Sequence, residues 1–393
     1  MVKSKTLKGY CVDKYFLSHP SFVFFIIWIT TITLASIEVV PVFMNQIKTA
    51  QMIVLLLIVS NLFGAVVALL ILGLPSKVRI GPIVYGFRRR IMLLWISISV
   101  IEIFSAGGIP LLWLIMGTGQ TYEDFGIPTL HGIANAFWMY ISFVQFIRLL
   151  DNIRDRKNII LMMVLALWPV LLVSRALFTI VLIQVTFFYL ITTHKKNWNL
   201  LVRSLFLLVV FAFVFGIAGE ARSDFSIVSG LGLNEDEFIF PALLWVYSYM
   251  VAPIISLSIN WGVITPEFSI FPLNTFSSLL PSVVRGALGL DLGFSSYIGS
   301  LTLAHNAFNV MTAFMSPYLD WGAYGVVIMS TTIGFIGHLV WMSSLGNPSK
   351  IPLLCVINAY VLLTIFTNQF AGLPTILLLI MWQKLTKSNK NKP

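Results

Sequence analysis

Hydrophobic runs of roughly 20 residues alternate with short polar segments along most of the chain. A helix of about 20 apolar residues crosses the hydrocarbon core of a bilayer, so each run predicts a membrane-spanning helix. We expect ten spans: 20–41, 51–74, 91–116, 129–150, 159–174, 176–193, 200–219, 322–343, 350–367 and 370–385. The pattern therefore predicts an all-α, polytopic integral membrane protein.

The composition supports this class. Hydrophobic residues make up 58% of the chain and charged residues only 10%, which no soluble globular domain matches. The net charge of +10 is scattered over short loops, as expected beside an anionic inner leaflet, and it does not indicate nucleic-acid binding. The two cysteines, Cys11 and Cys355, match no metal motif and are both expected near the inner face.

Basic residues set the orientation. Of the 25 Lys and Arg residues, 21 lie at the termini or between alternate spans, and basic loops mark the cytoplasmic side. Ten spans with both termini in the cytoplasm satisfy this pattern. No cleavable signal is apparent, because the first apolar run is too long for a signal peptide and is read as a retained helix.

The longest outer connection, 220–321, divides the chain into helices 1–7 (1–219), a long outer loop (220–321) and helices 8–10 with a tail (322–393). The segment 240–261 is apolar enough to span. We expect it to lie at the membrane interface, where its aromatic residues fit. The alternative is that it crosses the membrane and a second span near 297–316 restores the topology.

Four basic residues depart from the cytoplasmic pattern: Lys48, Arg175, Arg222 and Arg285. Three of them are arginines, and the planar fork of arginine suits phosphate. We therefore expect Arg175, Arg222 and Arg285 to bind a phosphorylated ligand at the outer face. Arg175 has an alternative as a lipid anchor.

The other two arginines have structural alternatives as well. Arg222 has acidic neighbours in Glu220 and Asp224, and Arg285 has one in Asp291. Glu220 is therefore expected to support Arg222.

Other side chains in or near the long loop are candidates for chemistry. His305 is the one histidine inside the loop and is the first candidate for a general base. Asp320 is the second, with an N-terminal helix cap as its alternative. Tyr247 and Tyr249 are candidates for ligand contacts or for anchoring at the interface.

Carboxylates inside predicted spans are costly and often functional. Glu38 and Glu102 are in this position, and we expect them to hold an arginine in place. His131 and His338 lie within or beside spans, where a structural hydrogen bond is the expected role. No HExxH, Cys/His cluster or phosphate loop with lysine is present, so no metal or cofactor is expected.

Several segments resemble a known family. The segments 308–314 and 318–325, with its Asp-Trp-Gly, resemble the loop-to-helix signature of bacterial O-antigen polymerases, the oligosaccharide repeat-unit polymerases. Further segments follow in the family's order: 107–112 with its double glycine, 122–128, 174–175, 216–223 and 247–249. The resemblance covers about residues 102–325.

The resemblance implies a fold and a reaction. It implies a metal-independent membrane glycosyltransferase of the GT-C type in the bacterial inner membrane. Such an enzyme transfers a growing glycan from undecaprenyl pyrophosphate onto a lipid-linked repeat unit at the periplasmic face, in lipopolysaccharide or other surface polysaccharide biosynthesis. A chain-length regulator protein is the implied partner, beside membrane lipids.

Three alternatives stay open. The ligase that moves finished polymer onto lipid A core uses similar arginine and histidine chemistry. A flippase for lipid-linked oligosaccharides belongs to another class, and inverted repeats would favour it; none is visible. A scaffold without catalysis is the third.

Overall fold

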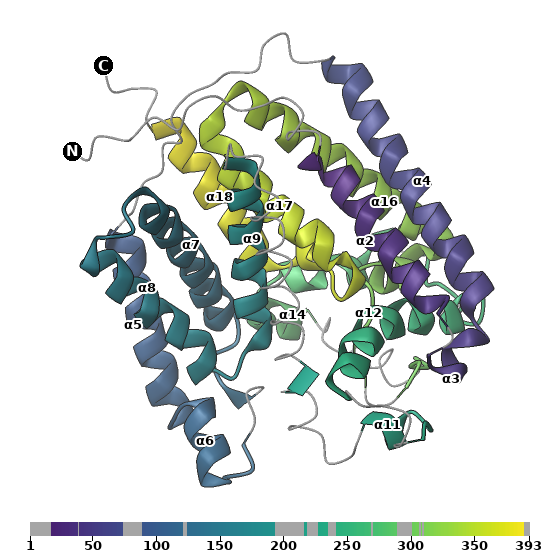
Figure 1. Cartoon of the computed structure of the whole chain (residues 1–393), viewed down its shortest axis with the longest axis horizontal. Helices are drawn as coiled ribbons and strands as arrows, with labels where there is room; N and C mark the ends of the chain where they lie inside the picture. Colours follow the sequence, from purple (N-terminus) through teal and green to yellow (C-terminus); the bar gives the residue numbers. More distant parts are fainter. Residues whose placement is uncertain are drawn as a thin grey trace.

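A computed structural model of the chain describes residues 17–37, 39–73, 89–120, 124–192, 216–217, 227–234, 241–268, 270–288, 301–305, 308 and 310–388. The regular secondary structure in these ranges is entirely helical (Figure 1). The α-helices are α2 Pro20–Ala35, α3 Pro41–Met44, α4 Ile47–Leu72, α5 Arg89–Ala106, α6 Pro110–Met116, α7 Leu130–Asp151, α8 Arg156–Leu171, α9 Arg175–Thr192, α11 Ile227–Gly230, α12 Pro241–Asn260, α13 Leu273–Phe276, α14 Ser282–Ala287, α16 Met315–Gly346, α17 Ile351–Leu362 and α18 Leu373–Ser388. Short 3-10 helices are η3 Ser277–Leu279, η4 Pro348–Lys350, η5 Leu363–Ile365 and η6 Gln369–Ala371.

Within these ranges, six helices are long and apolar enough to cross a membrane, judged by length and composition. They are Ile47–Leu72, Arg89–Met116, Leu130–Leu150, Pro241–Asn260, Met315–Gly346 and Pro348–Ile365. Five coincide with predicted spans, and the sixth is α12, which was expected at the interface. Shorter apolar helices occupy Pro20–Ala35, Ala176–Thr192 and Leu373–Gln383. The described part of the chain is all-helical, and its apolar helices indicate a multi-pass membrane protein. The predicted span 200–219 lies largely outside the described residues.

The closest helix pair is α4 with α16, and small residues make it possible. A Cβ atom on Gly64 would overlap the carbonyl oxygen of Thr331, and one on Gly334 would overlap that of Asn61. The hydroxyl of Ser330 donates to the carbonyl of Leu57 at 2.8 Å. Membrane helices lack a hydrophobic drive to associate, so close backbone approach and such hydrogen bonds hold the pair together.

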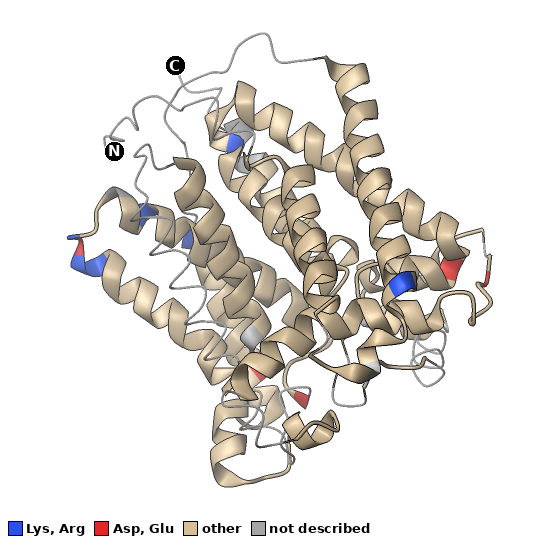
Figure 2. Ribbon diagram, turned by 45° about the vertical axis from the view of Figure 1, so that its right-hand side comes forward, with Lys and Arg blue, Asp and Glu red and all other residues tan. Residues whose placement is uncertain are grey.

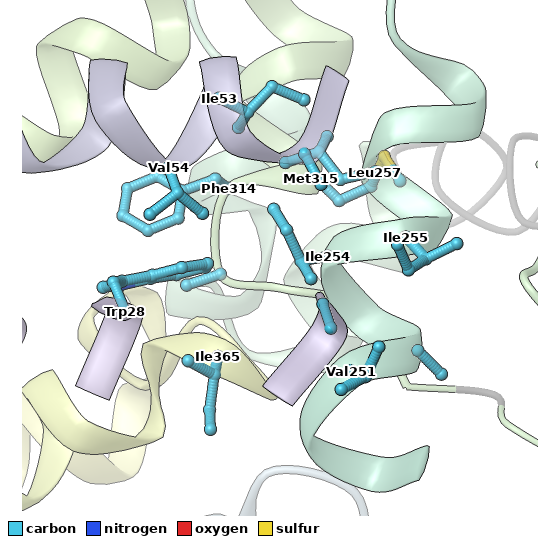
Figure 3. Packing of buried hydrophobic residues seen from close by; sticks show 14 of the residues in the cluster. Trp28, Ile53, Val54, Val251, Ile254, Ile255, Leu257, Phe314, Met315 and Ile365 are labelled. Atoms are coloured by element: carbon cyan, nitrogen blue, oxygen red, sulfur yellow. The ribbon is translucent and has the colours of Figure 1, made fainter. Parts of the chain in front are cut away.

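The buried side chains form two cores. One lies among α2, α4, α12 and the start of α16, and Figure 3 shows Trp28 and Phe314 packed there with Ile254. The Trp28 indole donates to Thr364 Oγ1 at 3.2 Å, which satisfies its buried N–H. The other core joins α5, α7, α8 and α9 to α17 and α18 around Trp138 and Trp382.

The charges are distributed unequally over the bundle. Arg89 and Arg90 begin α5, Arg148 lies in the last turn of α7, and Lys350 lies between α16 and α17. Figure 2 shows most of the described Lys and Arg in the upper left of the view, with Asp and Glu mainly lower. We call the end of the bundle at Arg89, Arg148 and Lys350 the basic end, and the opposite end the outer end. The positive-inside rule predicts that the basic end faces the cytoplasm.

Two histidines, His19 and His338, lie in contact between α2 and α16 at the basic end. His19 caps α2, its Nδ1 accepting the Ser21 backbone N–H at 3.1 Å. Its Nε2 lies 3.0 Å from His338 Nδ1. Burial, and then the nearby His338, lower the pKa of His19 to about 4. His338 therefore has the structural hydrogen bond expected for it.

Candidate functional site

Helix α12 packs against α2 and α4 at the outer end. The Tyr247 hydroxyl donates to the carbonyl of Ile37, in the outer connection between α2 and α4, at 3.1 Å. Near the other end of α12, the Gly262 N–H donates to the hydroxyl of Tyr318, close to the start of α16. Contacts near both ends are thus made with outer segments, which favours the expected interfacial position over a membrane crossing although α12 is long enough to cross.

Asp320 is buried and holds the loop segment 274–275. One carboxylate oxygen accepts the backbone N–H and the side-chain amide of Asn274, at 2.9 and 3.0 Å. The other accepts the backbone N–H and the hydroxyl of Thr275, at 2.8 and 2.6 Å. The two N–H groups belong to the first turn of α13, whose donors have no partner within the helix. Asp320 therefore caps α13.

This arrangement corrects the alternative role expected for Asp320, which was to cap a helix beginning at 322. The range Met315–Gly346 of α16 is divided into two helical parts by the non-helical residues Trp321 and Gly322, so the expected start at 322 coincides with this break. The carbonyls of Leu319 and Asp320 turn to the N–H groups of Glu267 and Phe268, at 3.0 and 2.8 Å. Gly322 has φ 58°, a conformation that favours glycine.

His305 lies in the segment 301–305, which is bound along α12. Asn260 of α12 donates to the carbonyl of Thr302 at 2.7 Å and accepts its N–H at 3.1 Å. The His305 ring lies 6.0 Å from the ring of Phe308, which in turn packs edge-on against Tyr249 at 5.4 Å. Two of the expected site residues, His305 and Tyr249, thus both lie next to the ring of Phe308.

The side chain of Tyr247 makes different contacts from that of Tyr249. Its ring stacks on Phe43, with centroids 6.4 Å apart, and its hydroxyl binds the carbonyl of Ile37. Two tyrosines two residues apart on a helix face different directions, so Tyr247 ties α12 to the α2–α4 connection while Tyr249 turns to Phe308. The contacts of Tyr247 therefore fit the expected role of an anchor better than that of a ligand contact.

Glu102 pairs with a histidine. Its carboxylate is fully buried, with Oε1 3.2 Å from Nδ1 of His131. The same oxygen accepts the backbone N–H of Ile127 at 3.3 Å. An arginine was expected in this place, and sequence reasoning missed His131 because 29 residues separate the pair. Among the described contacts of Glu102, His131 is the ionisable partner.

A series of contacts connects the double-glycine segment to this pair. Gly107 has φ 70°, and a Cβ on Gly108 would overlap the indole of Trp113. Trp113 packs on Phe125 at 6.1 Å, and Phe125 packs edge-on against His131 at 5.7 Å. Trp113 and Phe125 therefore lie between the double-glycine segment and the acid–histidine pair.

Two of the three predicted arginines lie within the described residues. Arg285 is half-buried on α14, at the outer end. Arg175 is the first residue of α9, where only its backbone is described. Arg222, Glu220 and Glu38 lie outside the described residues. The three arginines remain predictions from the sequence. In the described part of the chain, no group of three or more His, Cys, Asp or Glu is placed to hold a metal ion.

Comparison with known proteins gives no family. No family model matches the chain, and neither a curated protein nor a solved structure does.

Proposed function

We propose that this chain is a membrane glycosyltransferase that joins lipid-linked oligosaccharide repeat units into a surface polysaccharide of the O-antigen type. In the proposed reaction, the growing glycan leaves undecaprenyl pyrophosphate at the periplasmic face of the bacterial inner membrane. It is joined to the terminal sugar of one lipid-linked repeat unit.

The observation that carries the proposal is the kind of basic residue found at the outer end. Between Ser204 and Ser349 the chain has no lysine and only two arginines, Arg222 and Arg285. Arg175 begins α9, which like α7 starts at the outer end. Arginine binds phosphate oxygens through two parallel N–H groups. Positioned donors of this kind stabilise the negative charge that develops on a departing pyrophosphate.

The acceptor sugar needs a group that takes its hydroxyl proton. Both oxygens of Asp320 already accept two hydrogen bonds each, so the geometry favours a supporting role for Asp320. His305 lies beside Phe308, which packs against Tyr249, at the outer end. On these contacts His305 ranks above Asp320 as a proton acceptor.

The proposal is tested in the source bacterium by deleting the gene and resolving its surface glycans on a gel. Complementation with wild type should restore a ladder of repeat numbers. Arg222→Ala and Arg222→Lys should both fail at normal protein level, because lysine lacks the bidentate fork. Lys48→Ala, which removes a basic residue beside the outer connection of α2 and α4, is the matched control and should restore the ladder.

Three outcomes would contradict the proposal. Unattached lipid-linked polymer in the deletion strain would indicate the ligase. Absence of any repeat unit at the outer face would indicate a transporter. A full ladder from the triple variant of Arg175, Arg222 and Arg285 to alanine would indicate a scaffold without this chemistry.

A further inference from the structure

The Glu102–His131 pair is built as a carboxylate-oriented imidazole. Glu102 is 0% exposed, whereas the His131 side chain is 31% exposed. The carboxylate is thus removed from solvent and the imidazole is reachable. A histidine that serves as a base is oriented by a third group in this manner, with the carboxylate on the ring nitrogen away from the reacting atom.

The surrounding backbone makes room for the ring in this position. A Cβ on Gly126 would come within 2.7 Å of Nδ1 and 2.8 Å of Cγ of His131. Gly126 has φ 99°, which a residue with a side chain rarely adopts. The ring of Phe125 also packs against the imidazole, nearly perpendicular to it, with centroids 5.7 Å apart. The loop therefore fixes the imidazole against Glu102.

The contacts favour one tautomer of His131. Nδ1 lies 3.2 Å from a carboxylate oxygen, which accepts hydrogen bonds, so we assign the hydrogen of the neutral ring to Nδ1. In the neutral ring Nε2 then has the free lone pair. Among the described residues, Nε2 of His131 has no hydrogen-bond partner. It is the atom that can accept a proton from a ligand hydroxyl.

The pair lies at the outer end, near the segments of the proposed site. A Cβ on Gly132 would touch Pro374 at the start of α18, at 3.4 Å. Just before Pro374, the carbonyl of Ala371 accepts the hydroxyl of Ser278 at 2.6 Å. Ser278 lies on η3, between the Asp320-capped helix α13 and helix α14 with Arg285. A short series of contacts thus links His131 to the loop that carries Arg285.

We infer that His131, in place of His305, is the general base for the acceptor hydroxyl, because a buried carboxylate orients its ring, and that Glu102 is its positioning residue. The inference rests on the proposed function and names the base within it. The sugar hydroxyl gives its proton to Nε2 while its oxygen bonds to the anomeric carbon of the donor glycan. The bond from that carbon to the pyrophosphate oxygen breaks, and its electron pair leaves with undecaprenyl pyrophosphate. The imidazolium then returns the proton to the pyrophosphate or to water.

The test uses purified full-length protein in liposomes supplied with lipid-pyrophosphate-linked repeat units. His131→Gln should lower kcat at least about 100-fold, the usual contribution of a general base, with KM little changed. Glu102→Gln, which no longer fixes the tautomer, should lower kcat at least about 10-fold with KM again little changed. Glu267→Gln, at an exposed carboxylate of the outer loop, is the control and should keep the wild-type rate.

The split between kcat and KM separates the base from a merely structural pair. Folded His131→Gln and folded Glu102→Gln should both lose kcat at an unchanged KM, whereas loss of a structural contact would lower the amount of folded protein without changing kcat per folded molecule. A wild-type rate for His131→Gln would overturn the inference while leaving the polymerase proposal intact. If substitutions at 131 do not fold, a wild-type kcat for folded Glu102→Gln would overturn it. Failure of the wild type to extend any glycan would refute the proposed function itself.

Discussion

Asp320 shows at the scale of one residue how a buried carboxylate can hold a loop in place. Its two oxygens accept four hydrogen bonds from two successive residues. The capping role could not be predicted from sequence, because Asn274 and Thr275 are about 45 residues away and no local pattern joins them to Asp320. A local helix cap was the natural expectation, and it was wrong because both carboxylate oxygens of Asp320 bind Asn274 and Thr275 and not the helical residues after the break at Trp321 and Gly322.

Asp320→Asn should therefore destabilise the protein. The amide replaces one acceptor with a donor that faces two other donors, at a cost of about 3 kcal/mol or more. Thermal unfolding in detergent measures the loss. Glu267→Gln is the control, because Glu267 is exposed and makes a single 3.4 Å hydrogen bond to Asn274. A variant as stable as wild type but inactive would instead indicate that Asp320 acts directly on substrate.

The lowered pKa of His19 predicts that acid destabilises the folded protein. The folded protein lowers the pKa of His19 from 6.5 to about 4, so the unfolded chain binds the proton more readily. Stability should be complete above pH 6.5 and should be lost as the pH falls toward 4. The loss is on the order of 3 kcal/mol at about 1.4 kcal/mol per unit.

His19→Asn is the matched variant for this effect. Asparagine can still accept the Ser21 N–H as a helix cap, but it does not titrate. Its unfolding temperature should vary less between pH 7 and pH 4.5 than that of wild type. An equal acid sensitivity of both proteins would refute the role of His19.

At the scale of helices, hydropathy predicted where the long apolar helices lie along the chain better than it predicted which helices contact one another. Five of the six long apolar helices coincide with predicted spans, since hydrocarbon thickness sets a length that the sequence displays directly. The contact between α4 and α16 was not predicted. It depends on Gly64 and Gly334 meeting carbonyls of the facing helix, and a lone glycine within a span does not reveal its partner.

Gly334→Leu should separate α4 from α16 and lower the yield of folded protein. Its side chain cannot fit beside the carbonyl of Asn61, and overpacking costs about 1–3 kcal/mol or more. Gly346→Leu, at the end of the same helix with open space around it, should behave as wild type. Size-exclusion profiles and unfolding temperatures measure both, and equal profiles would rule out the close packing.

Helix α12 can be tested by labelling. In a variant without Cys11 and Cys355, single cysteines at Asn234 and Val263 should both react with an impermeant thiol reagent applied from outside. These exposed residues lie beyond either end of α12. A cysteine at exposed Ile153, between α7 and α8, should react only after permeabilisation. Reaction at just one of the two α12 sites would show that the helix crosses the membrane.

For the whole molecule, the sequence was sufficient for the class but not for the arrangement of the outer end. Charge and hydropathy predicted a multi-pass protein with an arginine-bearing outer face. They placed Glu102 beside an arginine and favoured His305 as the base. The fold places Glu102 against His131, because the loop around Gly126 returns the chain to α5. Such a return depends on tertiary packing, which no spacing in the sequence encodes.

The central claim is that the protein polymerises lipid-linked oligosaccharides at this outer end. The most direct measurement supplies one lipid-pyrophosphate-linked repeat unit to the purified protein in liposomes and counts repeats per lipid by mass spectrometry. The account predicts lipid-linked products of two, three and more repeats, with one undecaprenyl pyrophosphate released for each new linkage. A repeat unit that remains single, or crosses the bilayer unchanged, would contradict it.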